Sequence, residues 1–190
     1  AVTSSAPALP LAGVTVIDVS RMLPGAVLAR SLVDLGARVI KIEDPRGGDL
    51  MRLAPPLVGG IGVGFCVYFR GTESVGLDLR DPDGVTALKL LAARADVLIE
   101  SFRPGTMDRY GLATAGLRAD NPRLVVCSLP GFLGNAEVGH DLNFTALTGF
   151  LREVTPQGIP ALQIADVTSG LLASTAIVAA LLQRTRTGEG

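Results

Sequence analysis

Two side chains of this sequence have the chemistry to move a proton: the only histidine, His140, and Asp166, which comes just ahead of a long apolar segment. An imidazole and a carboxylate are a common acid–base pair near pH 7, because their unperturbed pKa values are about 6.5 and about 3.9. A structural interpretation is also open. Asp166 precedes Thr168 and Ser169 and could cap the helix that follows, and a lone histidine is often structural.

The elements around this pair alternate between β-branched apolar runs and helical patterns. Strands are predicted at residues 14–19, 38–43, 74–79, 96–100 and 123–128, and helices at residues 26–35, 81–95, 107–111, 142–151 and 167–184. The Gly- and Pro-rich segment 53–64 is predicted to be an irregular loop. The pattern predicts one α/β domain, a Rossmann-like open, mostly parallel sheet with helices on both faces.

In such a sheet, ligands bind at the carboxyl ends of the strands. The turns at residues 21–25, 44–49 and 102–105 and the stretch after Ser128 are therefore the expected binding region. A dinucleotide site is not indicated, because the turn after the first strand lacks the G-x-G-x-x-G glycines.

Composition excludes several functions. Of the 190 residues, 48% are apolar and 18% charged, the net charge is −1, and only 4% are aromatic. These values argue against disorder and against a nucleic-acid partner, which requires clustered Lys and Arg or stacking aromatics. The two cysteines, Cys66 and Cys127, are far apart and predict buried free thiols; with one histidine they cannot form a zinc site, and no metal is expected.

Residues 1–10 are expected to be a flexible N-terminal tail and residues 11–190 the folded domain. The tail has no basic residue and does not resemble a signal peptide. The most apolar run, residues 170–182, is interrupted by Ser174 and Thr175 and is short for a bilayer span, so it is predicted to be a core helix with no membrane partner. A cytoplasmic location is expected.

The chain contains, in order, LAGVTVID at 11–18, LGARVIKIE at 35–43, FRG at 69–71 before LDL at 77–79, DVLIESFRPG at 96–105 before DRYGL at 108–112, and GHDLN at 139–143. In this order the motifs resemble those of the family III CoA transferases and α-methylacyl-CoA racemases. The resemblance covers residues 11–190 and corresponds to the large, CoA-binding domain of that family. It implies an acyl-CoA substrate and no tightly bound cofactor, with coenzyme A present only as part of the thioester.

The resemblance implies alternative roles for the acid–base pair. In the racemases a histidine at the position of His140 and an aspartate at that of Asp166 exchange the α-proton of a 2-methylacyl-CoA. In the transferases the aspartate is instead a nucleophile that forms acyl-aspartyl and aspartyl-CoA intermediates. The histidine favours proton transfer, because transferases commonly have another residue there. A non-catalytic acyl-CoA-binding or assembly subunit is the third alternative.

Arg103 and Arg109 match family positions near the CoA phosphates, where a guanidinium fits the phosphate oxygens. The full set of candidate CoA-binding residues is Lys41, Arg70, Phe102, Arg103, Gly105 and Arg109. The chain departs from the family at Asp44, where some members have arginine, and in a shorter connection between Ser128 and His140. The family's small domain is also missing, so the expected assembly is a homo-oligomer or a complex with a chain that supplies this domain.

Overall fold

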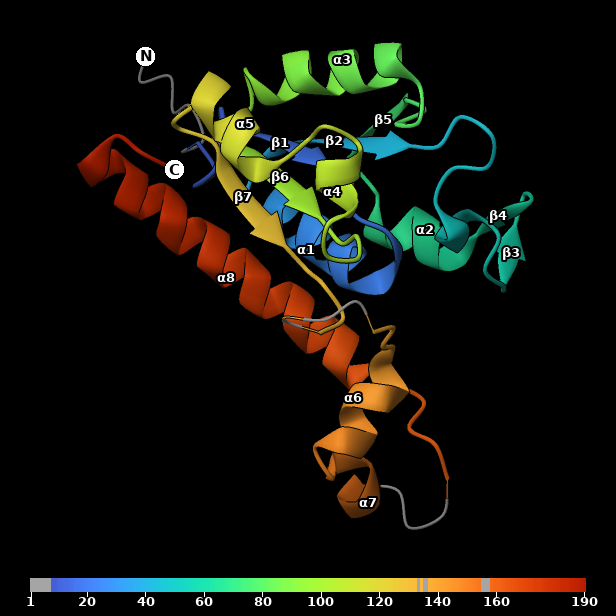
Figure 1. The fold of residues 1–190 in the computed structure, drawn as a ribbon. Helices are drawn as coiled ribbons and strands as arrows, with labels where there is room; N and C mark the ends of the chain where they lie inside the picture. The colour runs from blue at the N-terminus through green and yellow to red at the C-terminus, as the bar shows by residue number, and fades with distance from the viewer. Residues whose placement is uncertain (1–7, 133, 135–136, 155–157) are drawn as a thin grey trace, which may run out of the picture.

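The computed structural model describes residues 8–132, 134, 137–154 and 158–190 (Figure 1). Most of the expected N-terminal tail, residues 1–7, lies outside the described residues. The remainder of it is attached to the domain, since the Leu9 carbonyl accepts a hydrogen bond from the Ala12 amide.

The centre of the fold is a five-stranded sheet in the order β5-β2-β1-β6-β7. Its strands are β1 (Thr15–Asp18), β2 (Arg38–Glu43), β5 (Glu73–Gly76), β6 (Val97–Glu100) and β7 (Val125–Ser128). All neighbouring strands pair in parallel. The predicted α/β class and parallel sheet are confirmed. Because the chain moves outward from β1 first to one side and then to the other, the connections change direction between β1 and β6, where such sheets bind ligands.

Successive residues of the strands point to opposite faces of the sheet and belong to separate cores. Val16, Val97 and Ile99 pack in one core, and Ile17 and Leu98 in the other. All five are less than 2% exposed. Burial of both faces explains why the central strands β1 and β6 are mostly apolar, without polar alternation.

Helices cover both faces, as predicted (Figure 1). On one face lie α1 (Met22–Asp34) and α8 (Ile164–Thr187), whose side chains join the core of Val16. On the other lie α3 (Pro82–Ala92), α4 (Thr106–Arg109) and α5 (Thr114–Asp120). The helix α5 was not predicted from the sequence. Its buried anchor is a single residue, Leu117, so it lacks the long apolar periodicity that identifies a helix.

The predicted irregular loop at residues 53–64 is wrong in part. After a 3₁₀ turn at Leu50–Arg52, the chain forms a small antiparallel hairpin of β3 (Leu57–Val58) and β4 (Ile61–Gly62) and enters α2 (Val63–Tyr68). The turn of the hairpin is Gly59-Gly60, and both glycines have positive φ. Such a turn suits a hairpin, although two-residue strands are too short to give a sequence pattern.

The predicted burial of both cysteines is also wrong. Both thiols are free, but Cys66 is exposed and Cys127 is only partly buried. Cys66 lies in α2, which has no fully buried residue, so the apolar run around it is a short surface helix and not a strand of the core.

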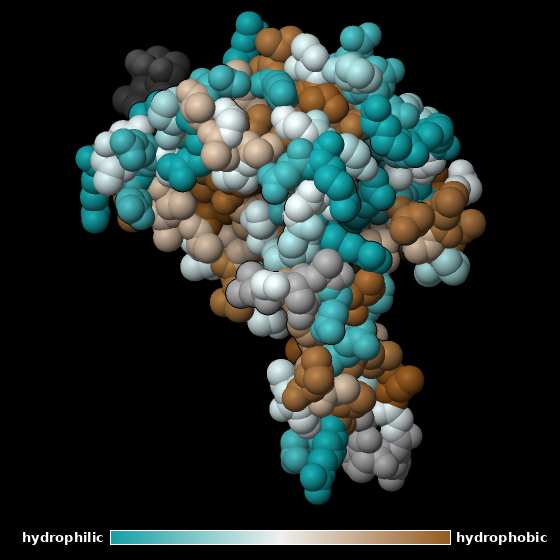
Figure 2. All heavy atoms as spheres, in the orientation of Figure 1, coloured by the Kyte–Doolittle hydropathy of each residue, from teal (hydrophilic) through white to brown (hydrophobic). Residues whose placement is uncertain are grey.

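The single helix predicted at residues 142–151 is two helices, α6 (Asp141–Leu147) and α7 (Phe150–Val154). Gly149, with φ of 77°, ends the first of them in a left-handed conformation. The two helices project from the sheet domain beside the start of α8 (Figure 1), and apolar side chains are visible on this projection in Figure 2. Leu142 and Leu147 are 43% and 72% exposed.

Helix α8 begins at Ile164, three residues before the predicted start, so Asp166 lies within its first turn. Close packing against α1 is possible because Gly170 has no side chain: a Cβ there would lie 2.6 Å from the Pro24 carbonyl oxygen. In the described chain, α8 alone is long and apolar enough to cross a membrane. Only one face of it packs in the core, and Leu172 on another face is 65% exposed, so the predicted core helix is only partly buried.

Candidate active site at the carboxyl ends of the strands

Two cavities open at the carboxyl ends of the strands, on either side of the turn that follows β1. Arg21, in this turn, lines both. Its backbone N–H donates to the Ser101 hydroxyl at 2.8 Å, and its guanidinium lies 5.5 Å from the centre of the Phe102 ring. The turns after β1 and β6, some 80 residues apart in sequence, are thereby joined at the point where the sheet connections reverse.

The larger cavity, about 730 Å³, contains both proton-transfer candidates and is called the His–Asp cavity below. His140 reaches it from the residue before α6, and Asp166 from the first turn of α8. Its other lining residues include Met22, Pro24, Leu129, Pro130, Phe144 and Ile159. The structure therefore brings the two residues, 26 positions apart in the chain, to one cavity beside the sheet.

The N-terminus of α8 is held by Asp141, the residue next to His140. One carboxylate oxygen of Asp141 accepts hydrogen bonds from the Ala165 amide at 2.6 Å and the Asp166 amide at 3.1 Å. Asp141 is only 6% exposed. Asp166 is therefore not the cap of its helix, and among the described residues none donates a hydrogen bond to its carboxylate.

The surroundings of Asp166 make its carboxylate a stronger base than an exposed aspartate. Burial raises the pKa of Asp166 above its usual value, and the negative charge of Asp141 raises this pKa further, while His140 opposes the shift. A general acid–base group works best when its pKa approaches the working pH. The free, half-buried carboxylate of Asp166 thus has the properties of a base or a nucleophile.

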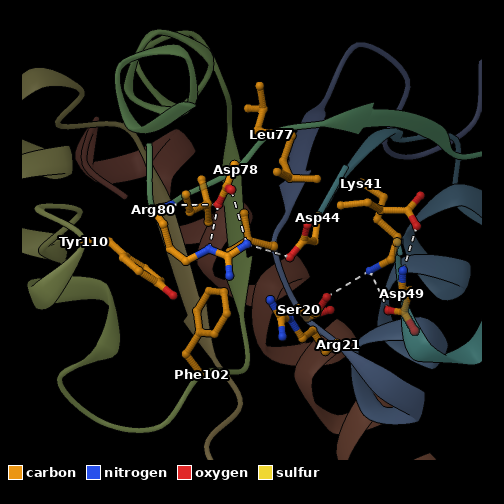
Figure 3. Close-up of a pocket in the computed structure, with 15 residues that line it drawn as sticks. Ser20, Arg21, Lys41, Asp44, Asp49, Leu77, Asp78, Arg80, Phe102 and Tyr110 are labelled. Carbon is orange, nitrogen blue, oxygen red and sulfur yellow. Dashed lines mark hydrogen bonds and ion pairs between the residues drawn. The ribbon is translucent and has the colours of Figure 1, made fainter. Parts of the chain in front are cut away.

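The smaller cavity, about 190 Å³, is lined from the ends of β1, β2, β5 and β6 and is called the arginine cavity (Figure 3). One wall is aromatic: the rings of Phe102 and Tyr110 meet edge to face with centres 6.2 Å apart. Leu77 and Leu79 add apolar surface. A flat aromatic group of a ligand could stack in such a cavity.

Ion pairs between Asp44, Arg46, Asp78 and Arg80 surround part of the arginine cavity. Arg46 contacts both oxygens of Asp44, at 2.9 and 2.8 Å. Arg80 donates to Asp78 at 2.9 Å and to Asp44 at 3.1 Å (Figure 3). Hydrogen bonds from Arg46 hold the pKa of Asp44 below its usual value. These two arginines and two aspartates together carry no net charge.

Lys41 lies at the inner end of the same cavity and is only 1% exposed. Its ammonium donates to the Ser20 carbonyl oxygen at 2.9 Å and pairs with Asp18 at 3.5 Å and Asp49 at 3.2 Å. The ring of Phe69 lies 4.4 Å from the same nitrogen. Because these groups surround it, Lys41 holds the ends of β1 and β2 together.

The structure brings only some of the candidate CoA-binding residues to a cavity. Lys41 and Phe102 line the arginine cavity. Arg70, Arg103, Gly105 and Arg109 line neither of the two cavities. The three arginines are exposed, and Arg109 donates a hydrogen bond to the Thr106 hydroxyl. Their role in binding CoA stays a prediction.

Sequence reasoning did not single out Asp141, Arg21 or Arg80 as site residues. The signal for Arg21 was its place directly after the first strand, at the expected binding edge. Asp141 adjoins the histidine, but its hydrogen bonds to residues 165 and 166 depend on how two helices meet. Arg80 follows the third sheet strand in chain order, so its place at the expected binding edge could have been predicted from the sequence.

The fold and these cavities define an α/β protein with a ligand site at the reversal point of a parallel sheet. Residues 11–190 match the model of CoA-transferase family III, and the chain belongs to that family. The predicted resemblance is confirmed.

Relatives of both activities are similar to the chain. It is 36% identical to a succinate–glutarate CoA-transferase of Agrobacterium fabrum, over 95% of this chain and 49% of the relative. It is 35% identical to the human alpha-methylacyl-CoA racemase, over 96% and 46%. A crystal structure of a CAIB/BAIF family protein from Brucella suis superposes with a TM-score of 0.88 at 36% identity, over 97% of this chain and 52% of that protein. The chain therefore spans about half the length of these relatives.

Proposed function

We propose that the chain carries the acyl-CoA site of an enzyme that exchanges the α-proton of a 2-methylacyl-CoA, with His140 and Asp166 as the acid–base pair. One observation carries the proposal: both side chains line a single cavity at the reversal point of the sheet. The raised pKa of Asp166 supports it, because a stronger carboxylate base lies closer in basicity to imidazole.

In one direction the Asp166 carboxylate takes the α-proton. The C–H bond breaks, and its electron pair delocalises onto the thioester oxygen to give an enolate-like species. The protonated imidazole of His140 then delivers its proton to the opposite face of the α-carbon, and a new C–H bond forms. The turnover ends with Asp166 protonated and His140 neutral. Asp166 then loses its proton to solvent and His140 gains one from it, which restores the starting charges and brings solvent deuterium into the exchange.

The rest of the substrate extends from the His–Asp cavity to the arginine cavity. Phe102 and Tyr110 offer an aromatic wall for the adenine base. Arg21 lines both cavities, and no ion pair within the described part of the chain engages its guanidinium. It therefore has a cation available for the diphosphate that links the two ends of CoA. We further expect a cytoplasmic protein that works as a homo-oligomer or with a chain that supplies the family's second domain.

The second candidate is a CoA transferase with Asp166 as nucleophile. A carboxylate oxygen attacks the thioester carbonyl, the C–S bond breaks, and CoA leaves as thiolate to give an acyl-aspartyl anhydride. The thiolate then attacks the aspartyl carbonyl, the C–O bond of the anhydride breaks, and the donor acid leaves as its carboxylate to give aspartyl-CoA. An acceptor carboxylate takes the place of the donor, the same two steps run in reverse, and the new acyl-CoA leaves Asp166 free. The carboxylate of Asp166, free of hydrogen bonds from the described residues, favours this chemistry equally, and the Agrobacterium relative is named as a transferase.

The test is solvent-deuterium exchange into a 2-methylacyl-CoA, with the protein isolated together with any chain that copurifies. We expect one deuterium at the α-carbon, and a loss of about 100-fold or more in Asp166→Asn and His140→Gln. Asp34→Asn, which removes an equal charge far from the cavities, should exchange normally. Borohydride or hydroxylamine modification of Asp166 in the presence of acyl-CoA would instead establish the transferase. CoA binding without either reaction would indicate a non-catalytic binding subunit.

A further inference from the structure

Two carboxylates, each paired with an arginine, line the strand-end rim of the arginine cavity. Asp44 comes directly after β2, and Asp78 follows β5, the neighbouring strand. Both line the cavity, and both side chains are 31% exposed. A ligand that enters between the aromatic wall and these strands meets both carboxylates together with the Arg80 guanidinium that pairs with them (Figure 3).

Of the arginines near this rim, Arg46 and Arg80 are already engaged by the two carboxylates. Arg46 makes two hydrogen bonds to Asp44, and Arg80 makes one to Asp44 and two to Asp78. A phosphate that binds the Nε and Nη2 groups of these arginines would have to displace a carboxylate from a charge-assisted, bidentate pair. It would also lie beside the displaced carboxylate, a like charge.

Neutral hydroxyl groups fit this rim better. A carboxylate oxygen that is already paired keeps lone pairs with which it can accept an O–H donor. In dinucleotide-binding sheets, a carboxylate in this region accepts from a ribose hydroxyl, whereas an arginine accommodates a ribose phosphate.

We propose that Asp44 and Asp78 face the ribose of the adenosine portion and that the site makes no favourable use of the ribose 3′-phosphate. This inference rests on the proposed acyl-CoA function and specifies its nucleotide selectivity. 3′-Dephospho-CoA then binds at least as tightly as CoA, and the diphosphate, held by Arg21, is the main anionic contact.

Calorimetric titration with CoA and with 3′-dephospho-CoA tests the proposal on the protein as isolated. We expect dephospho-CoA to bind the natural sequence with equal or higher affinity. Asp44→Asn removes the carboxylate that pairs with Arg46 and with one nitrogen of Arg80. A charge-assisted contact then becomes available to the 3′-phosphate. We therefore expect the affinity for CoA relative to that for dephospho-CoA to rise by about fivefold or more. Asp78→Asn, which loosens Arg80, should move the ratio the same way and serves as a second variant if the first does not fold.

Asp34→Asn is the matched control: it makes the same change in net charge at a site that lines neither cavity, where Asp34 pairs with Arg30. Its ratio should equal that of the natural sequence. The proposal is overturned if CoA binds the natural sequence about tenfold or more tightly than dephospho-CoA, or if the folded Asp44 variant changes the ratio no more than the control does. Either result leaves the acyl-CoA function standing. If neither CoA nor dephospho-CoA binds, that function and this inference are overturned together.

Discussion

The proton affinity of Asp166 depends on Asp141, which faces it from the residue after His140. Burial and then the charge of Asp141 raise the pKa of Asp166. In Asp141→Asn the second cause is gone, so the pKa of Asp166 falls and its basic form persists to lower pH. An asparagine oxygen can still cap the amides of α8.

We therefore predict that the acidic limb of kcat/KM for deuterium exchange moves to lower pH in Asp141→Asn. The rate at the plateau should fall as well, because the base is weaker. The pH profile of exchange is the measurement, and Asp34→Asn should leave the limb in place. A limb that moves to higher pH would mean that Asp141 does not act on Asp166 through its charge.

Glu43 gives a separate prediction on acid stability. Burial alone would raise the pKa of this carboxyl, but hydrogen bonds from Arg52, Ser74 and the Asp49 amide outweigh it and lower the pKa from 4.5 to about 2. A lowered carboxyl pKa adds stability above pH 4.5 that is lost as pH falls toward 2. At 1.36 kcal/mol per pKa unit the contribution is at most about 3 kcal/mol.

Urea unfolding between pH 5 and pH 2 measures this contribution. In Glu43→Gln the free energy of unfolding should be lower at pH 5 and should fall less on acidification. Glu73→Gln removes a carboxylate that pairs with Arg38 on the exposed edge of the sheet and should change little, because solvent screens such pairs. Equal effects of the two substitutions would contradict the assignment.

At these individual positions, sequence predicted that His140 and Asp166 face one another across a site, and both line one cavity, but it did not predict the hydrogen bonds of Asp141. The prediction came from the two residue types and from the family resemblance. The hydrogen bonds of Asp141 depend on the packing of α6 against α8, which the sequence does not reveal. The surroundings of Lys41 could not be predicted from the sequence for the same reason. A lysine in a strand can face a ligand, and only the packing of Asp18 and Asp49 around it reveals a buried structural ion pair.

Among the elements, the contact of α1 with α8 positions Asp166, and it depends on Gly170. A Cβ there would lie 2.6 Å from the Pro24 carbonyl oxygen and 2.8 Å from the Val27 Cβ. Gly170→Ala must push the helices apart, and we predict a loss of about 1–3 kcal/mol in the free energy of unfolding. Reduced deuterium exchange should accompany it, because Asp166 lies one turn away.

Gly116→Ala is the control for helix propensity. Gly116 lies in α5, and no heavy atom lies within 4 Å of the place that its Cβ would occupy, so the same substitution should be neutral or stabilise by up to about 1 kcal/mol. Chemical denaturation of the two variants gives the comparison. Equal stability of Gly170→Ala and the natural sequence would show that α1 and α8 can adjust at no cost.

The elements that sequence predicted well are those whose burial is continuous. All five strands of the sheet were located. The central strands β1 and β6 were the clearest, since both of their faces are buried and their runs are mostly apolar, whereas β5 at the edge is mostly exposed. The hairpin and α5 escaped prediction because they are short and bury few side chains. The division between α6 and α7 depends on Gly149, and a glycine inside a helical pattern does not by itself specify a break.

For the molecule as a whole, the two cavities predict where a bound acyl-CoA slows amide hydrogen exchange. Protection should appear together in the turns after β1, β2, β5, β6 and β7 and at the starts of α6 and α8. Helix α5, which lines neither cavity, should exchange at the same rate with and without ligand. Mass spectrometry of exchanged peptides measures this. Protection confined to one cavity would mean that the ligand does not extend across Arg21.

The parallel arrangement of the strands followed from the alternation of strands and helices, because each helix returns the chain to the same end of the sheet. The division of the binding edge into two cavities could not be predicted from this alternation. It depends on the contact between Arg21 and Ser101, which is fixed only when β1 and β6 lie side by side. Arrangements of this kind arise from tertiary packing, which residue patterns do not encode locally.

Asp141 also has a mechanical consequence for the reacting groups. One peptide bond connects it to His140, and one hydrogen bond connects it to the amide of Asp166. The backbone of His140 and the backbone of Asp166 are thus connected to each other through the single residue Asp141. If the projecting helices swing during turnover, the two groups should travel as a unit, and the gap across which a proton is relayed should stay nearly constant while the mouth of the cavity widens or narrows.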